Sequence, residues 1–191
     1  MDFNGARWYK CDLHLHTTAS KCFQDREVTP QKWVNRAINQ GLDCVAVTDH
    51  NSSNGIEAIQ KVAEDTNLTV FPGVEITCDT SKVHLLVLFD PFRKATDVRD
   101  FLIRCDIDET NFGSQDAKTS KSIIEIVDMA SKYDALVIPA HVDEYNGLGA
   151  IGNQILKEFY SRGDINAVQV VHKEFHENEY SNTSIGEIVP S

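Results

Sequence analysis

Residues 11–17 read Cys-Asp-Leu-His-Leu-His-Thr, a short apolar strand pattern that carries two histidines two positions apart. Residues i and i+2 of a strand point to the same face, so this stretch predicts that His14 and His16 lie together while Leu13 and Leu15 point the other way. Such a pair of imidazoles is either a pair of metal ligands or the polar face of a half-buried strand. The remainder of the chain has to distinguish these two interpretations.

Outward from this stretch, apolar strands alternate with amphipathic helices. Strands are predicted at 12–16, 43–49, 68–77, 82–89, 135–141 and 165–171, and helices at 30–41, 54–66, 98–105, 119–133 and 150–162. The helix from Pro30 has Thr29 as its cap and Gly41 at its end. This alternation is typical of an α/β fold with mainly parallel strands that are buried on both faces.

The composition is that of a single globular domain over residues 1–191, with a polar tail from about residue 174. The net charge of −11 argues weakly against broad electrostatic binding to nucleic acid or to anionic membranes. No apolar run approaches the length of a membrane span, and the first ten residues lack the apolar core of a signal peptide, so we expect a cytoplasmic protein that does not interact with membranes. Five scattered cysteines without a CxxC pair predict neither a disulfide framework nor a zinc knuckle.

Further histidines and one glutamate fall on or at the ends of predicted strands. They are His50, Glu75, His84 and His141. The carboxyl ends of parallel strands share one rim, where active sites form in such folds. A single histidine is more often a satisfied core or surface group, but a converging set with one carboxylate would be costly to bury without a partner. Imidazole and carboxylate ligands suit zinc, manganese or iron, so the sequence predicts a divalent metal site.

Five short motifs occur in the order found in one known family. They are His-Leu-His-Thr at 14–17, Val-Thr-Asp-His-Asn at 47–51, Pro-Gly-Val-Glu-Ile-Thr at 72–77, His-Leu-Leu-Val-Leu-Phe at 84–89 and Ile-Pro-Ala-His-Val at 138–142. In these motifs the chain resembles the PHP (polymerase and histidinol phosphatase) domain family over about residues 10–172. The resemblance implies a distorted (β/α)7 barrel with a two- or three-metal site that hydrolyses phosphoesters.

Carried over motif by motif, the resemblance also implies roles for individual residues. His14 and His16 would bind a first metal, Glu75 would bridge two metals, His84 and His141 would complete the second, and His50 would bind a third. Asp12 and Asp49, each near a ligand, would accept hydrogen bonds that fix the histidine tautomers. For either aspartate, capping of a turn at the end of a strand is an equally good interpretation.

The sequence departs from the family pattern in two places. Lys21 occupies a position where many members carry another third-metal ligand, so two divalent ions are expected and the third site should be weak or absent. Lys21 is either a contact for a substrate phosphate or a solvated surface lysine. The Asp-x-His motif that usually closes the site is also missing, because no aspartate follows Asp164.

The missing motif predicts a barrel that is incomplete at its C-terminal end. His172 and His176 are more simply surface residues than replacements for it. We therefore expect an N-terminal module of a longer protein whose C-terminal domains lie outside this chain, with an ATPase as one candidate for them.

These features predict metal-dependent hydrolysis of a phosphoester by a hydroxide bridging two ions, with no catalytic side chain beyond the ligands. The substrate would be a phosphorylated small molecule or a nucleic-acid end, cleaved as a monoester or as a diester. No GxSxG motif is present and no cysteine has an evident histidine partner in the sequence, so nucleophilic catalysis by a side chain is not expected. The alternative is a degenerate PHP module with a structural or regulatory role in a larger protein.

Overall fold

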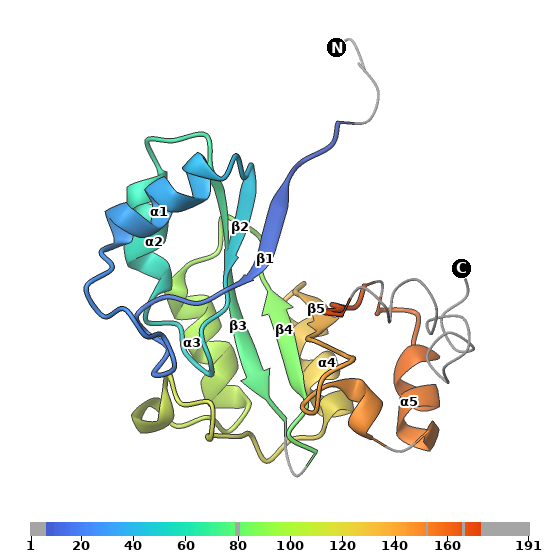
Figure 1. The fold of residues 1–191 in the computed structure, drawn as a ribbon. Coiled ribbons are helices and arrows are strands. Elements are labelled where there is room, and N and C mark those ends of the chain that lie inside the picture. Colours follow the sequence, from blue (N-terminus) through green and yellow to red (C-terminus); the bar gives the residue numbers. More distant parts are fainter. Residues whose placement is uncertain (1–6, 79–80, 152, 166, 173–191) are drawn as a thin grey trace.

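The computed structural model describes residues 7–78, 81–151, 153–165 and 167–172 (Figure 1). Its strands are β1 (Cys11–Leu15), β2 (Cys44–Val47), β3 (Thr69–Thr77), β4 (His84–Leu88) and β5 (Leu136–Pro139). Its α-helices are α1 (Pro30–Asn39), α2 (Ile56–Ala63), α3 (Ala95–Arg104), α4 (Ile123–Ser131) and α5 (Asn153–Tyr160). Short 3₁₀ turns lie at Glu109–Asn111 and Leu148–Ala150. The order of strands and helices predicted up to residue 162 is therefore confirmed.

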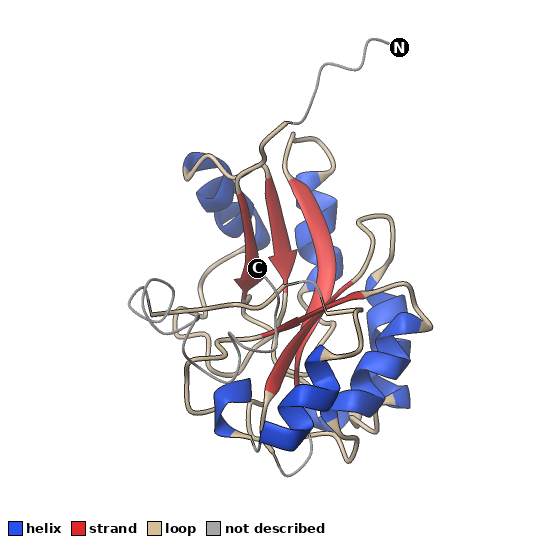
Figure 2. Ribbon diagram, turned by 90° about the vertical axis from the view of Figure 1, so that its right-hand side faces the viewer, coloured by secondary structure: helices blue, strands red, loops and turns tan. Residues whose placement is uncertain are grey.

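The strands form one five-stranded sheet in the order β1-β2-β3-β4-β5. The pairs β1/β2 and β2/β3 are parallel, whereas β3/β4 and β4/β5 are antiparallel. The long strand β3 belongs to both halves, because its first residues pair with β2 and its last residues pair with β4. Figure 2 shows that the sheet curls, with the helices outside the curl, so the fold is α/β with a half-barrel sheet.

The prediction of a mainly parallel sheet was wrong for β4. Only residues 78–83 separate β3 from β4, and a connection of this length cannot make the crossover that parallel strands require. The chain therefore turns back as a hairpin, and the start of β4 lies at the edge where β3 ends, since Thr77 pairs with His84.

The predicted strand at 165–171 is not a strand in the described part of the chain. Residue 169 does lie beside β5, because the Gln169 N–H donates to the Pro139 carbonyl and its own carbonyl accepts from the Val142 N–H, both at 2.9 Å. These two bonds hold an extended segment at the end of β5 without building a ladder. The polar tail predicted from residue 174, and His176 within it, lie outside the described residues.

The principal core lies between the sheet and the helices. Helix α1 contributes Trp33, Val34 and Ala37, all buried. Its start is fixed as predicted, with the Thr29 hydroxyl accepting from the Lys32 N–H and Pro30 in the first turn. A second, smaller apolar cluster lies on the other face of the sheet and includes Ala46, Leu86, Leu88, Ile138 and Ala140. No helix among the described residues is long and apolar enough to cross a membrane.

A register shift between Asp12 and Leu15 interrupts the regular alternation of β1. As a result Leu13 packs against the smaller cluster and Leu15 against the principal core. The prediction that these two leucines share a face was therefore wrong, because a bulge inserts an extra residue into the period-two pattern.

Candidate metal centre

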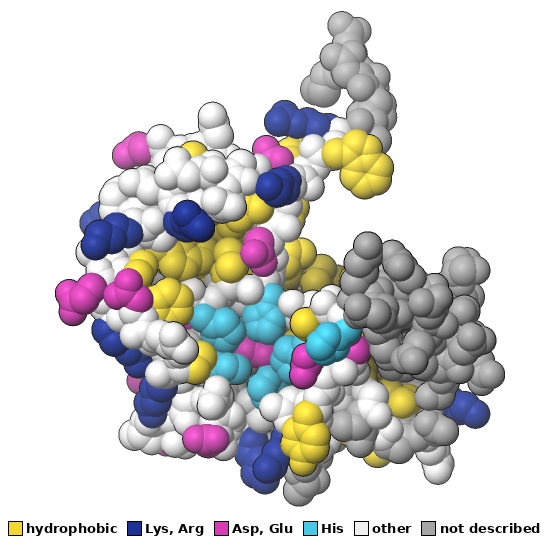
Figure 3. All heavy atoms as spheres, viewed as in Figure 1, with side chains coloured by type: hydrophobic (Ala, Val, Ile, Leu, Met, Phe, Trp, Pro, Cys, Tyr) yellow, Lys and Arg dark blue, Asp and Glu magenta, His cyan; other side chains and the backbone are white. Residues whose placement is uncertain are grey.

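One carboxylate lies at the centre of five imidazoles. Glu75, from the second half of β3, is 1% exposed. It is surrounded by side chains from the other four strands or from residues that directly follow those strands. These are His14 and His16 from β1 and its end, His50 after β2, His84 at the start of β4 and His141 after β5. Figure 3 shows the histidines gathered around an acidic side chain in a hollow below an apolar band. The six residues predicted as ligands are thus brought together.

The reversal of β4 explains how His84 reaches this group. His16 and His50 lie just beyond the carboxyl ends of β1 and β2. If β4 ran parallel to these strands, its first residue would lie at the opposite end of the sheet. Because β4 runs antiparallel, its first residue, His84, lies at the same rim.

Three ring nitrogens converge on the Oε2 atom of Glu75. The distances are 3.1 Å to His14 Nε2, 3.2 Å to His16 Nε2 and 3.0 Å to His50 Nδ1. The other oxygen, Oε1, lies 2.8 Å from His84 Nδ1 and 3.1 Å from His141 Nε2. Despite these short distances, Glu75 Oε2 and His50 Nδ1 are buried and make no hydrogen bond.

The hydrogen bonds behind the ligands determine which nitrogens carry protons. The Ser20 hydroxyl donates to Asp49 Oδ1 at 2.7 Å, because a carboxylate can only accept. Its oxygen must therefore accept at 2.9 Å from His16 Nδ1, which holds the proton of that ring. The Asp49 carboxylate, which also accepts from Thr17, thus acts on His16 through Ser20.

Gln169 performs the same task for His14 and was missed by the sequence analysis. Its side-chain oxygen lies 2.8 Å from His14 Nδ1 and accepts from the His141 backbone N–H at 3.1 Å. Because a backbone N–H must donate, the shared atom is the amide oxygen, and His14 Nδ1 carries the proton. No local pattern could have found this contact, since 155 residues separate Gln169 from His14.

These tautomers leave the lone pairs of both Nε2 atoms directed at each other and at Glu75. The two Nε2 atoms lie 3.3 Å apart, and each lies close to Glu75 Oε2. Three electron-rich atoms at this spacing repel one another unless positive charge lies among them. His14, His16 and Glu75 also form a group whose ligand atoms all lie within 4.8 Å, as do His50, Glu75 and His84. The residues therefore fit divalent cations by geometry and by chemistry.

The same electrostatics shift the pKa values of two groups. Burial alone would lower the pKa of His14, but Glu75, Gln169 and Asp12 outweigh it and raise that pKa above its usual value. Burial alone would raise the pKa of Glu75, but the surrounding imidazoles of His14, His141, His16 and His50 hold it well below its usual range. The carboxylate is consequently ionised at neutral pH and available to a cation.

The two predicted acceptor aspartates differ in position. Asp49 is fully buried and accepts hydrogen bonds from the backbone and hydroxyls of Thr17 and Ser20. Among the described residues, Asp12 accepts only from the backbone N–H of His14, at 3.3 Å. In the described structure neither carboxylate bonds directly to an imidazole; Asp49 reaches His16 through the Ser20 hydroxyl, whereas Asp12 bonds to the backbone of its own strand.

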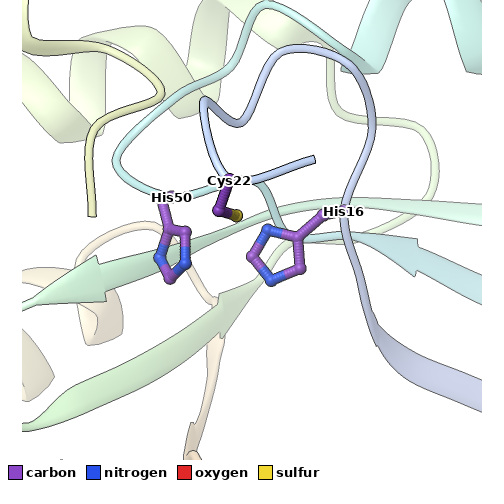
Figure 4. Close-up of side chains that lie close together, drawn as sticks. All are labelled: His16, Cys22 and His50. Carbon is purple, nitrogen blue, oxygen red and sulfur yellow. The ribbon is translucent and has the colours of Figure 1, made fainter. Parts of the chain in front are cut away.

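Of the neighbouring residues Lys21 and Cys22, the structure brings Cys22, which the sequence did not mark as a site residue, close to candidate ligands. Lys21 is exposed and its backbone N–H donates to the Gly113 carbonyl at 2.7 Å. The next residue, Cys22, lies near His16 and His50 (Figure 4). Burial and the negative charges of Glu75 and Asp49 raise the pKa of its thiol. No cysteine has an evident histidine partner in the linear sequence, but the fold brings the Cys22 thiol close to two imidazoles.

The remaining histidine that the structure describes lies at the surface, as expected. His172 is exposed, with its Nε2 2.8 Å from Glu144 Oε1.

Five histidines around one buried carboxylate, at the rim of a curled α/β sheet, form a centre typical of proteins that bind divalent metal ions. The family model for the PHP domain matches residues 12–186. The chain belongs to the PHP domain family.

Comparison with curated proteins identifies relatives that act on RNA. The chain is 28% identical over 154 residues to a 5′-3′ exoribonuclease of Haemophilus influenzae, a match that covers 80% of this chain and 49% of the relative. It is 35% identical over 96 residues to the 5′-3′ exoribonuclease Rnm of Salmonella typhimurium, covering 48% of this chain and 31% of the relative. The chain therefore spans about half or less of the length of these relatives.

Two solved structures have a similar fold. One is the lesion-specific endonuclease PfuEndoQ of Pyrococcus furiosus, with a TM-score of 0.67 and 21% identity over 88% of this chain and 44% of that one. The other is a protein of Bifidobacterium adolescentis described as a metal-dependent phosphoesterase, with a TM-score of 0.57 and 17% identity over 84% of this chain and 77% of that one. At these identities the similarity establishes the fold.

Proposed function

We propose that this chain is a metal-dependent phosphoesterase domain that hydrolyses a phosphodiester of nucleic acid. The observation that carries the proposal is the convergence of five imidazoles on the buried carboxylate of Glu75. Membership of the PHP family, the exoribonuclease relatives and the phosphoesterase and endonuclease folds support phosphoester hydrolysis in general terms.

In this proposal His14, His16 and Glu75 hold one divalent ion and Glu75, His84 and His141 hold a second. His50 is a further candidate ligand on the Oε2 side of the carboxylate, since its Nδ1 lies 3.0 Å from Glu75 Oε2. Bound divalent ions supply a Lewis acid and a route to activated water. The protein keeps the ligands in the binding tautomer: Ser20 and Gln169 hold the Nδ1 protons of His16 and His14, which directs both Nε2 lone pairs inward.

A groove beside the centre supports a nucleic-acid substrate. A cavity of about 710 Å3 borders His14 and His16. Its lining is mostly apolar and includes the rings of Phe23 and Trp33, the cationic residues Lys32 and Arg36, and the acidic residue Asp12. Its volume is within the usual range for ligand sites. Positive side chains with adjacent aromatic rings are suited to a phosphate backbone and its bases. In a chain with a net charge of −11, cations on this wall would offset the general repulsion of nucleic acid.

Lys21 is proposed as a contact for a substrate phosphate; it is exposed and precedes Cys22, whose thiol lies near His16 and His50. We also propose that the described sheet is part of the distorted barrel expected for the family, within a longer protein. The ions would be manganese, zinc or iron, the metals that imidazole and carboxylate ligands suit.

The experiment compares a 5′-phosphorylated single-stranded RNA with p-nitrophenyl phosphate as substrates, with Mn²⁺ or Zn²⁺ added. We expect cleavage of the RNA, and a loss of more than about 100-fold in Glu75→Gln, because that change removes the charge shared by all five imidazoles. Glu57→Gln is the matched control, since Glu57 is an exposed residue of α2.

Hydrolysis of p-nitrophenyl phosphate alone would replace nucleic acid by a phosphorylated small molecule as the substrate class. Binding of ions without cleavage of either substrate would contradict the enzyme proposal and would favour the alternative of a degenerate module with a structural role. Equal rates for Glu75→Gln and the parent would show that the activity does not come from this centre.

A further inference from the structure

A second set of ligand atoms lies next to the Glu75 centre. It consists of His16, Cys22 and His50, whose ligand atoms all lie within 4.8 Å of one another. Figure 4 shows the Cys22 thiol between the two imidazoles. The cysteine comes from the loop after β1, whereas His50 follows β2, so the fold and not the sequence spacing brings them together.

The loop that carries Cys22 is held against the backbone of His50. The Lys21 N–H donates to the Gly113 carbonyl at 2.7 Å, and the Gly113 N–H donates to the His50 carbonyl at 3.0 Å. On the other side, the His50 N–H donates to the Ser20 hydroxyl at 3.0 Å. The two residues that precede Cys22 are therefore tied to the backbone of His50 by hydrogen bonds, Ser20 directly and Lys21 through Gly113.

An unpaired ring atom supports a bound ion at His50. His50 is 7% exposed, and its Nδ1, which lies 3.0 Å from Glu75 Oε2, makes no hydrogen bond. A buried polar atom without a partner is costly, and coordination is one way to satisfy it. Cys22, in contrast, is exposed, so an ion can enter this corner from solvent.

We propose that His16, Cys22 and His50 form an alternative site for one thiophilic divalent ion, such as Zn²⁺ or Co²⁺. Two imidazoles and a thiolate are a donor set that such ions prefer. A neutral imidazole offers one nitrogen lone pair, so His16 and His50 cannot serve this ion and an ion at Glu75 at the same time. Occupation of the thiolate site therefore withdraws two imidazoles from the Glu75 centre, and the identity of the ion selects between the two arrangements.

This inference rests on the proposed function for its consequence but is tested without measuring hydrolysis. The intact chain is titrated with Co²⁺ and followed by absorption, because a thiolate bound to Co²⁺ gives a near-ultraviolet charge-transfer band. We expect the band in the parent chain at about one ion per chain, and its loss in Cys22→Ser. Cys11→Ser is the matched control, since Cys11 is another exposed cysteine, and it should keep the band.

Glu75→Gln separates the two proposals. The thiolate site does not use this carboxylate, so the band should persist in Glu75→Gln even though hydrolysis is lost. A band that survives Cys22→Ser, or no band in the parent, would overturn the inference. A band that disappears in Glu75→Gln would also overturn it, because the thiol would then belong to the Glu75 centre and not to a separate site. Circular dichroism of each variant confirms that it is folded.

Discussion

Gln169 shows how one distant side chain can determine the state of a ligand. Its amide oxygen accepts from His14 and from the backbone of His141, so it holds residues from the first and the last strands of the described sheet in one orientation. Side chains that fix the tautomer of a ligating histidine affect metal affinity although they never touch the ion.

We predict that Gln169→Leu weakens divalent-ion binding by about 10- to 100-fold, because His14 loses the acceptor that keeps its proton on Nδ1. Competition with a fluorescent chelator measures the affinity. Gln169→Glu, which retains an acceptor oxygen, should bind close to normally, and Gln31→Leu on the outer face of α1 is the control. Equal affinities for Gln169→Leu and the control would show that the tautomer is fixed in another way.

Among individual residues, the candidate ligands carry signals in the sequence, whereas most of the side chains that support them do not. His14, His16, His50, Glu75, His84 and His141 carry signals in the sequence, because each lies at a strand end or within a family motif. Cys22 and Gln169 carry no such signal, since their contacts depend on how a loop folds back and on residues far apart in the chain. Asp49 follows a strand directly before His50 in the sequence, but its contact with His16 through the Ser20 hydroxyl follows only from three-dimensional distances.

Within the connecting loops, Gly113 joins the segment before Cys22 to His50. It has a φ of +80°, and a Cβ at this position would lie 2.2 Å from the Ala19 carbonyl oxygen. Both the conformation and the space therefore require glycine. Gly41, after α1, has a similar φ of +68° but has no atom within 4 Å of the corresponding position.

This pair gives a matched prediction. Gly41→Ala should lower the free energy of unfolding by about 1–2 kcal/mol, the cost of a left-handed conformation for a residue with a Cβ. Gly113→Ala should cost clearly more, because the backbone of Ala19 must also move. Urea denaturation measures both changes, and equal losses would contradict the close approach that the structure describes.

Secondary-structure elements were predictable where amphipathic periodicity and capping residues mark them, as in α1 with Thr29, Pro30 and Gly41. The direction of β4 was not predicted from its composition, since a buried antiparallel strand is as apolar as a parallel one. The short connection between β3 and β4 contained the necessary information. The segment at 165–171 has the alternation of a strand, yet in the described structure only Gln169 bonds to the end of β5.

At the scale of the whole molecule, the centre connects the two outer strands of the described sheet. His14 comes from β1 and His141 follows β5, and their rings stack with centroids 5.9 Å apart. No hydrogen-bond ladder joins these two strands, since three strands separate them in the sheet. The curl of the sheet brings their side chains together, and Gln169 bridges His14 and the backbone of His141.

We predict that Mn²⁺ or Zn²⁺ slows amide hydrogen exchange in β1 and β5 to a similar extent, because ions held by residues of both strands stabilise the closed sheet. Mass spectrometry of deuterated peptides measures this protection. In Glu75→Gln the protection should be reduced at both strands. Protection limited to one strand would indicate that the ions bind on one side of the carboxylate only.

The stacking of His14 on His141 has a consequence for the unfolded chain. These residues lie more than one hundred positions apart, so ions that join them through Glu75 close a loop that contains most of the described residues. A covalent link across a loop of this size stabilises a protein by about 4–5 kcal/mol in the chain-entropy model. Bound metal would thus act as a reversible staple, and a chelator would restore to the denatured ensemble the conformational freedom that the staple removes.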